Sequence, residues 1–277
     1  MTAPVRNRQL PAAPPADLLA GPVLAWLSAL RAAMVVQART TSWMKLVLPG
    51  MVQPAVFVII TLGPAVTDLD PRTAILGSAM AALWSVTLWQ SGMVLRRESW
   101  QGTLAGMGSR PPGILPVLIG KGVVAATISA AAIAAAVVAA MAVTGHRFEI
   151  ADPGTFAVAV LLCLVTAFPL GHLVACLFML TKAALRVAEV LVFPVFLIGG
   201  MLIPLTDLPA WVRPLSALLS LRWSHELMTD ATFGRPTQAV AWVGLVLTCA
   251  GYCAASAIAY RRVLARAHRD GTLDLIG

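Results

Sequence analysis

The titratable side chains of this sequence do not form a recognisable catalytic set. His172 and Glu189 stand alone inside apolar stretches, and His225 is followed directly by Glu226 in a more polar segment. Nucleophilic hydrolysis needs a serine or cysteine activated by a histidine, and glycoside cleavage needs two opposed carboxylates. Neither constellation is present, so we expect a protein that is not itself an enzyme.

Two isolated groups allow more than one interpretation. His172 follows Pro169 and Gly171 in an apolar run, where a titratable group often marks a transport pathway. The alternative is a structural histidine that bonds a backbone carbonyl freed by the proline. Glu189 lies one helical turn after Arg186, so an ion pair near the membrane surface competes with a proton relay.

The sequence offers no convincing site for a metal or a nucleotide. No set of cysteines or aspartates accompanies His225 and Glu226 at the spacing that zinc ligands require. Gly120-Lys121 is not a phosphate-binding loop, because Gly122 follows it in place of Ser or Thr. The cysteines all lie inside apolar runs, where packing is the simplest role: Cys163, Cys176, Cys249 and Cys253. We expect this chain to bind no metal and no cofactor of its own.

The stretch from Val192 to Met228 is the most unusual in the chain. An apolar run there is interrupted by Pro194, Gly199, Gly200 and Pro204. Proline removes a backbone donor, so we expect the helix to break before it leaves the lipid. Broken backbone at that depth survives only where protein or a water-filled cavity covers it. A gate and a plain kinked helix both fit this pattern.

Beyond the break, apolar residues recur at helical spacing. They predict a short amphipathic helix half sunk in the outer face of the bilayer. These residues are Leu208, Trp211, Val212, Leu215, Leu218 and Leu219.

The amino-acid composition indicates whether the chain folds in water or in a lipid bilayer. Of the 277 residues, 59% are hydrophobic and 12% are charged, and the mean hydropathy is +0.84. Soluble proteins carry about a quarter charged residues. The sequence therefore predicts an all-α polytopic membrane protein, with helices as the elements that position the broken stretch.

Six apolar runs are close to or longer than the roughly 20 residues that cross a bilayer. They are Leu46–Thr67, Thr73–Leu95, Ile114–Val143, Phe156–Leu180, Val187–Leu205 and Gln238–Tyr260. We predict a flexible cytoplasmic tail at 1–21, an interfacial amphipathic helix at 22–45, a six-span domain at 46–260 and a cytoplasmic tail at 261–277.

The distribution of basic residues sets the orientation. With both termini inside, fifteen of the 20 Lys and Arg residues fall in inner segments and five in outer ones. This positive-inside asymmetry predicts cytoplasmic termini. It also accounts for the net charge of +8 without nucleic acid as a partner.

Glu98 precedes Gly102-Thr103-Leu104, and Gly199-Gly200 precede Leu208-Pro209 and Trp211. These two motifs resemble those of ABC-2 type ABC transporter permeases. In the family's cytoplasmic coupling segment an acidic residue precedes Gly-Thr-Leu, a proline follows, and Gly-Lys opens the next helix. The matching residues here are Glu98, Gly102, Thr103, Leu104, Pro111, Gly120 and Lys121. After the fifth span, Gly-Gly, a proline and L-P-x-W-x-x-P-L also resemble the family pattern. Departures are Gly106 and Gly108 in the coupling segment and Ser220 after the outer helix.

The resemblance implies the membrane subunit of a bacterial, daunorubicin-resistance-like exporter in the plasma membrane. Two permeases, identical or paralogous, would pair with two separate ABC ATPase subunits, which bind ATP and Mg. By resemblance, the ATPase couples at Glu98, Gly102, Thr103, Leu104 and Pro111. The expected gate and pathway residues are Gly199, Gly200, Pro204, Trp211 and His172.

The expected substrate is an amphiphilic drug or lipid. The low aromatic content of 6% argues against a polysaccharide, since sugars are commonly held by aromatic rings. Export of a lipid-linked polysaccharide or a peptide by the same architecture stays open. So do two other classes, a membrane-embedded lipid-modifying enzyme and a structural scaffold or regulator.

Overall fold

A computed structural model describes residues 21–40, 70–100, 114–145, 148–181, 183–201 and 208–270. Within these ranges the chain forms helices and no strand, which confirms the all-α prediction. In chain order they are α1 (Gly21–Thr40), α3 (Pro71–Val86), the π-helix η1 (Thr87–Ser91), α4 (Val94–Trp100), α6 (Leu115–Thr144), α7 (Pro153–Leu180), α8 (Ala184–Ile198), α9 (Arg213–Ser216), α10 (Ser220–Phe233) and α11 (Ala239–Asp270).

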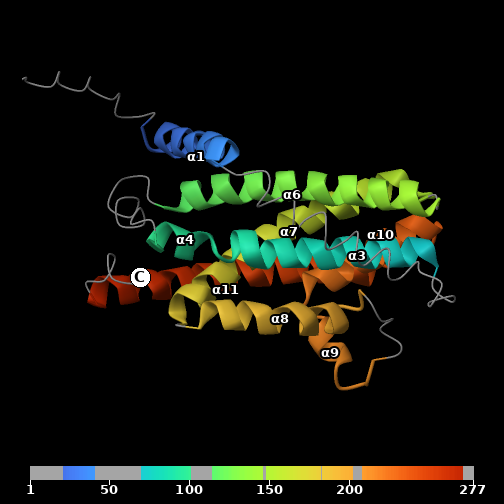
Figure 1. Ribbon diagram of the computed structural model, residues 1–277. Helices are drawn as coiled ribbons and strands as arrows, with labels where there is room; N and C mark the ends of the chain where they lie inside the picture. The colour runs from blue at the N-terminus through green and yellow to red at the C-terminus, as the bar shows by residue number, and fades with distance from the viewer. Residues whose placement is uncertain are drawn as a thin grey trace, which may run out of the picture.

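The long helices form a bundle around α7 (Figure 1). α7 packs against α11, α10, η1, α4 and α6. We call the end of the bundle that holds α4, the end of α7 and the end of α11 the α4 end. The opposite end, which holds the start of α3 and the end of α10, is the α10 end.

Three of the described helices are long and apolar enough to cross a membrane. These segments are Leu115–Val143, Pro153–Leu180 and Ala239–Val263. They confirm the predicted third, fourth and sixth spans as helices of the required length. The predicted first span, Leu46–Thr67, lies outside the described residues. The last helix continues to Asp270, ten residues beyond the predicted span.

The predicted second span is helical but not one regular helix. α3 passes into η1, where the Gly92 amide donates to the Thr87 carbonyl at 3.0 Å, five residues back. The Thr87 hydroxyl also donates to the Leu83 carbonyl at 2.8 Å, so side chain and backbone share the acceptors of this turn. π-Helical turns of this kind are often found at functional sites.

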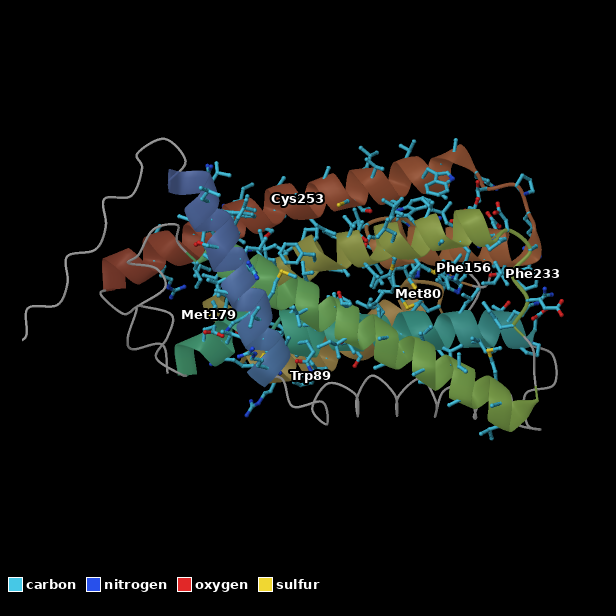
Figure 2. All side chains as sticks on the ribbon, turned by 90° about the horizontal axis from the view of Figure 1, so that it is seen from above. Met80, Trp89, Phe156, Met179, Phe233 and Cys253 are labelled. Atoms are coloured by element: carbon cyan, nitrogen blue, oxygen red, sulfur yellow. The ribbon has the colours of Figure 1, made fainter. Side chains whose placement is uncertain are left out.

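α1 covers the segment predicted as an interfacial helix as far as Thr40, and residues 41–45 lie outside the described residues. Its place at the membrane surface stays a prediction. α1 lies across α6 (Figure 2) and buries Ala33 there, while its basic side chains Arg31 and Arg39 are exposed. The helix also exposes large apolar side chains, as a helix in contact with lipid does. These are Val23, Leu24, Leu27, Val35 and Val36.

α3 begins with a capping arrangement that also joins it to α10. Asp70 is the N-cap, and its Oδ1 accepts from the Arg72 amide at 2.8 Å, while Pro71 occupies the first turn. The Arg72 guanidinium donates to the same carboxylate and lies 4.2 Å from the centre of the Phe233 ring. Hydrogen bonding by the Arg72 side chain lowers the pKa of Asp70.

We expect Asp70→Ala to destabilise the protein by about 1 kcal/mol at neutral pH, through loss of the cap. Because the folded-state pKa of Asp70 is lowered, its contribution is present above the ordinary aspartate pKa and is lost as the pH falls below it. The carboxylate is exposed, which reduces the ionic part. Thermal unfolding in detergent, with Asp70→Asn as the variant that keeps a cap, measures the effect. Equal melting temperatures for Asp70→Ala and the parent would contradict it.

Candidate functional site

The fifth predicted span breaks at the paired glycines. α8 runs through Pro194 and ends at Ile198, with Gly199 as its C-cap. Gly200 follows with φ of 70°, in the left-handed region that favours glycine. The Gly200 amide donates to the Leu197 carbonyl at 3.2 Å and closes the turn. The break predicted at Gly199 and Gly200 is confirmed, whereas Pro194 does not interrupt the helix.

The end of the broken helix lies in backbone contact with α3. A Cβ atom at Gly77 would collide with the carbonyl oxygen of Met201 and lie 3.1 Å from its carbonyl carbon. Met201 itself is buried, and the neighbouring Ser78 is fully buried. Only glycine permits an approach this close. We call this contact between Gly77 and Met201 the hinge seat.

The outer segment differs from its prediction. The amphipathic helix predicted over 208–219 is a series of turns around α9, which has only four residues. Pro209 and Pro214 lack the backbone donors that a longer helix needs, and Pro214 stands at the start of α9. Trp211 is 73% exposed, as expected for a side chain at a membrane surface. Pro204 lies outside the described residues.

α10 is a helix that was not predicted from the sequence. It packs against α7, α11 and α3 and buries one apolar face in the main core. Its buried residues recur at helical spacing: Leu221, Ser224, Leu227, Met228 and Ala231. That periodicity was the available signal. The last turn of α10 is joined to the start of α7, because the amide of Asp152, the N-cap of α7, donates to the Ala231 carbonyl at 2.9 Å.

A stripe of polar side chains runs along one flank of α10. Four of them have a buried polar atom without a hydrogen-bond partner among the described residues: Arg222 Nε, His225 Nε2, Glu226 Oε2 and Thr229 Oγ1. Positions 222, 225, 226 and 229 share one helix face. Buried polar atoms normally have hydrogen-bond partners, so this face of α10, like the hinge seat, is a candidate for a role beyond packing.

α4 is bound to three other elements through three consecutive side chains. Arg96 reaches the end of α7, Arg97 reaches η1, and Glu98 pairs with Lys121 of α6. The Glu98 and Lys121 side chains are only 5% and 14% exposed. The carboxylate predicted to couple to the ATPase is thus held in a buried ion pair at the α4 end.

The other predicted coupling residues follow α4 directly in the sequence. Gly102, Thr103, Leu104 and Pro111 lie outside the described residues. Their predicted role stays a prediction.

His172 lies apart from the broken helix. It is buried in α7, stacked on Phe168 with ring centres 6.4 Å apart, and 5.8 Å from the Tyr260 ring of α11. His172 lies in the second half of α7, toward the α4 end, whereas Met201, two residues after Gly199, packs on Gly77 of α3. The structure therefore does not bring His172 and the paired glycines together. Their shared role as gate residues stays a prediction.

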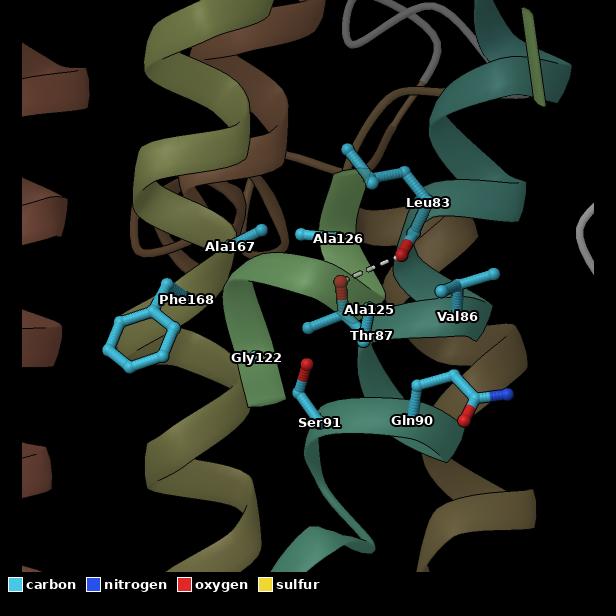
Figure 3. A pocket seen from close by; sticks show the side chains of 10 residues that line it. All are labelled: Leu83, Val86, Thr87, Gln90, Ser91, Gly122, Ala125, Ala126, Ala167 and Phe168. Atoms are coloured by element: carbon cyan, nitrogen blue, oxygen red, sulfur yellow. Dashed lines mark hydrogen bonds between the residues drawn. The ribbon is translucent and has the colours of Figure 1, made fainter. Parts of the chain in front are cut away.

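A small pocket lies beside η1, between α3, α6 and α7 (Figure 3). The Phe168 side chain forms one wall, and Thr87, Gln90 and Ser91 supply polar groups. Small residues of α6 and α7 complete the lining: Gly122, Ala125, Ala126 and Ala167. Within the part of the chain that the structure describes, no three His, Cys, Asp or Glu side chains lie together as metal ligands would.

Residues 33–233 match the family model described as ABC-2 type transporter. The matched range runs from α1 to the last residue of α10, so it includes the hinge seat and the α4 ion pair. The sequence matches no curated protein.

Proposed function

The chain belongs to the ABC-2 type transporter family and is the membrane permease of an ABC transporter; on this premise we propose that it exports amphiphilic drug or lipid-like molecules from the cell. ATP is hydrolysed by a separate ABC ATPase, the kind of partner with which the family works. Two permease subunits, identical or paralogous, complete the pathway in a bacterial plasma membrane. Such efflux would protect the cell against a toxic amphiphile such as an antibiotic.

The observation that carries this proposal is the hinge seat. An ordinary span would continue to the membrane surface, yet α8 ends at Ile198 and its last turn rests on α3. The left-handed Gly200 lets the chain change direction while it is covered by protein. A joint of this kind lets the outer segment move with modest strain, which a gate for release requires.

The charges of the bundle support an orientation with the α4 end in the cytoplasm. Most described basic residues lie at that end: Arg96, Arg97, Lys121, Arg186, Arg261, Arg262 and Arg266. Fewer belong to the start of α3 and to the segment from α9 to the loop after α10: Arg72, Arg213, Arg222 and Arg235. Positive residues are retained on the inner side. The proposed docking segment, from Glu98 through Pro111, then faces the ATPase.

An amphiphilic substrate suits the two kinds of surface in the structure. The spanning helices expose apolar side chains, such as Val138 and Leu161, toward lipid. The stripe on α10 offers polar groups near the opposite, outer end. A molecule with an apolar body and a polar head would have favourable surroundings both in the lipid beside the spanning helices and at the polar stripe on α10.

The test uses the permease purified with its ATPase and reconstituted in proteoliposomes. We expect ATP-dependent movement of a dansyl-labelled long-chain amine, and a severalfold rise in ATP turnover when that probe is added. An ATPase variant that lacks its phosphate-binding lysine is the control for the energy source. Stimulation by a water-soluble sugar or peptide, with no response to the amine or to a fluorescent phospholipid, would contradict the proposal.

A further inference from the structure

Arg96 binds the end of a helix other than its own. Its Nη1 atom donates to the carbonyl oxygen of Phe178 at 3.1 Å and to that of Thr181 at 3.0 Å. Both carbonyls belong to the last turn of α7 and its C-cap. The final carbonyls of a helix have no partner within it and carry partial negative charge. Arg96 therefore caps α7 from α4.

The residues on either side of Arg96 make different connections. The Arg97 guanidinium donates to the Trp89 carbonyl at 2.9 Å and to Gln90 Oε1 at 3.0 Å, both in η1, the helical segment that precedes α4. Glu98 accepts from Lys121 of α6. α4 is only seven residues long. Leu95 of α4 packs in one buried cluster with residues of α6 and α7, and the charged side chains add one polar link to α7 and another to α6.

The end of α7 lies immediately before the broken helix. Thr181 is separated from the start of α8 by two residues, and the Ala183 amide donates to Thr181 Oγ1 at 3.3 Å. α8 then leads to Gly199 and the hinge seat. A displacement of α4 that pulls on Thr181 is therefore delivered to the first turn of α8.

We propose that Arg96 is a positioning residue that transmits movement of α4 to α7 and α8, while Glu98 transmits it separately to α6. This inference rests on the proposed function, in which the ATPase docks on the segment after α4. The coupling element then has two side-chain outputs, and the one through Arg96 leads to the start of α8. Such a network needs direct evidence that both ends respond to the same event.

The experiment places one spin label on each output in the complex of permease and ATPase. The native cysteines are replaced by alanine, and a cysteine is introduced at Val190 of α8 or Val123 of α6, which are 69% and 42% exposed. Addition of ATP and Mg should change the electron paramagnetic resonance line shape at both positions in the Arg96 parent. In Arg96→Gln the change at Val190 should be lost, and the change at Val123 should persist.

Two further variants make the result specific. Arg96→Lys should restore part of the response at Val190, because an ammonium group donates to carbonyls without the fixed fork of arginine. Arg262→Gln removes an exposed arginine of α11 and should leave both responses unchanged. These controls separate a role of Arg96 from a general loss of positive charge.

Each outcome decides the matter. A preserved response at Val190 in Arg96→Gln overturns the inference, and so does a loss at both positions, since the link through Glu98 is intact. If neither label in the parent responds to ATP, the proposed coupling to an ATPase fails, and the inference fails with it. A loss confined to Val190 supports both.

Discussion

Replacement of Lys121 by methionine should destabilise the protein by about 3–5 kcal/mol, because it leaves a buried carboxylate without its cation. Glu98 and Lys121 are both largely buried, and they join α4 to α6. Removal of one charge strands the other in surroundings that solvate it poorly. Chemical denaturation in detergent, followed by tryptophan fluorescence, measures the free energy of unfolding.

The double variant Glu98→Gln with Lys121→Met distinguishes this explanation from simple loss of packing. Without either charge, no ion remains to be solvated, so the double variant should be more stable than Lys121→Met alone. Lys121→Arg keeps the charge and should lie close to the parent. A Lys121→Met variant within about 1 kcal/mol of the parent would show that water reaches the pair, as it does for surface ion pairs.

The third, fourth and sixth spans were predictable because lipid imposes a strong and local requirement. A run such as Ile114–Val143 must satisfy its own backbone, so length and composition alone predicted α6 almost to the residue. The break at Gly199 and Gly200 was predictable for the same reason. Glycine at these positions has a direct backbone consequence, which the φ of 70° at Gly200 displays.

The parts that were missed depend on contacts between distant residues. Local propensity does not predict the π-helical turn of η1, because the sequence around Thr87 is typical of a regular apolar helix. α10 carries enough polar residues to read as a loop, and packing against α7 and α11 is what makes it a helix. The capping of α7 by Arg96 joins residues 82 and 85 positions apart, with no periodic signal to predict it.

The hinge seat gives the largest functional expectation. A side chain at position 77 would displace Met201, so Gly77→Val should move the end of α8 away from α3. Export by the reconstituted complex should then fall to the level measured without ATP, because release depends on this joint. Assembly with the ATPase and basal ATP turnover should persist, because Glu98 and Lys121 lie at the far end of the bundle.

Gly251→Val is the matched control, since that glycine of α11 has open space where a Cβ would stand. Gly251→Val should therefore leave export unchanged, whereas Gly77→Val should abolish it. If both variants export at the parental rate, α8 is free to shift without consequence and the hinge seat is a packing contact only. If Gly77→Val also fails to assemble with the ATPase, the substitution has disturbed the whole bundle. The loss of export would then be explained without a gate at the hinge seat.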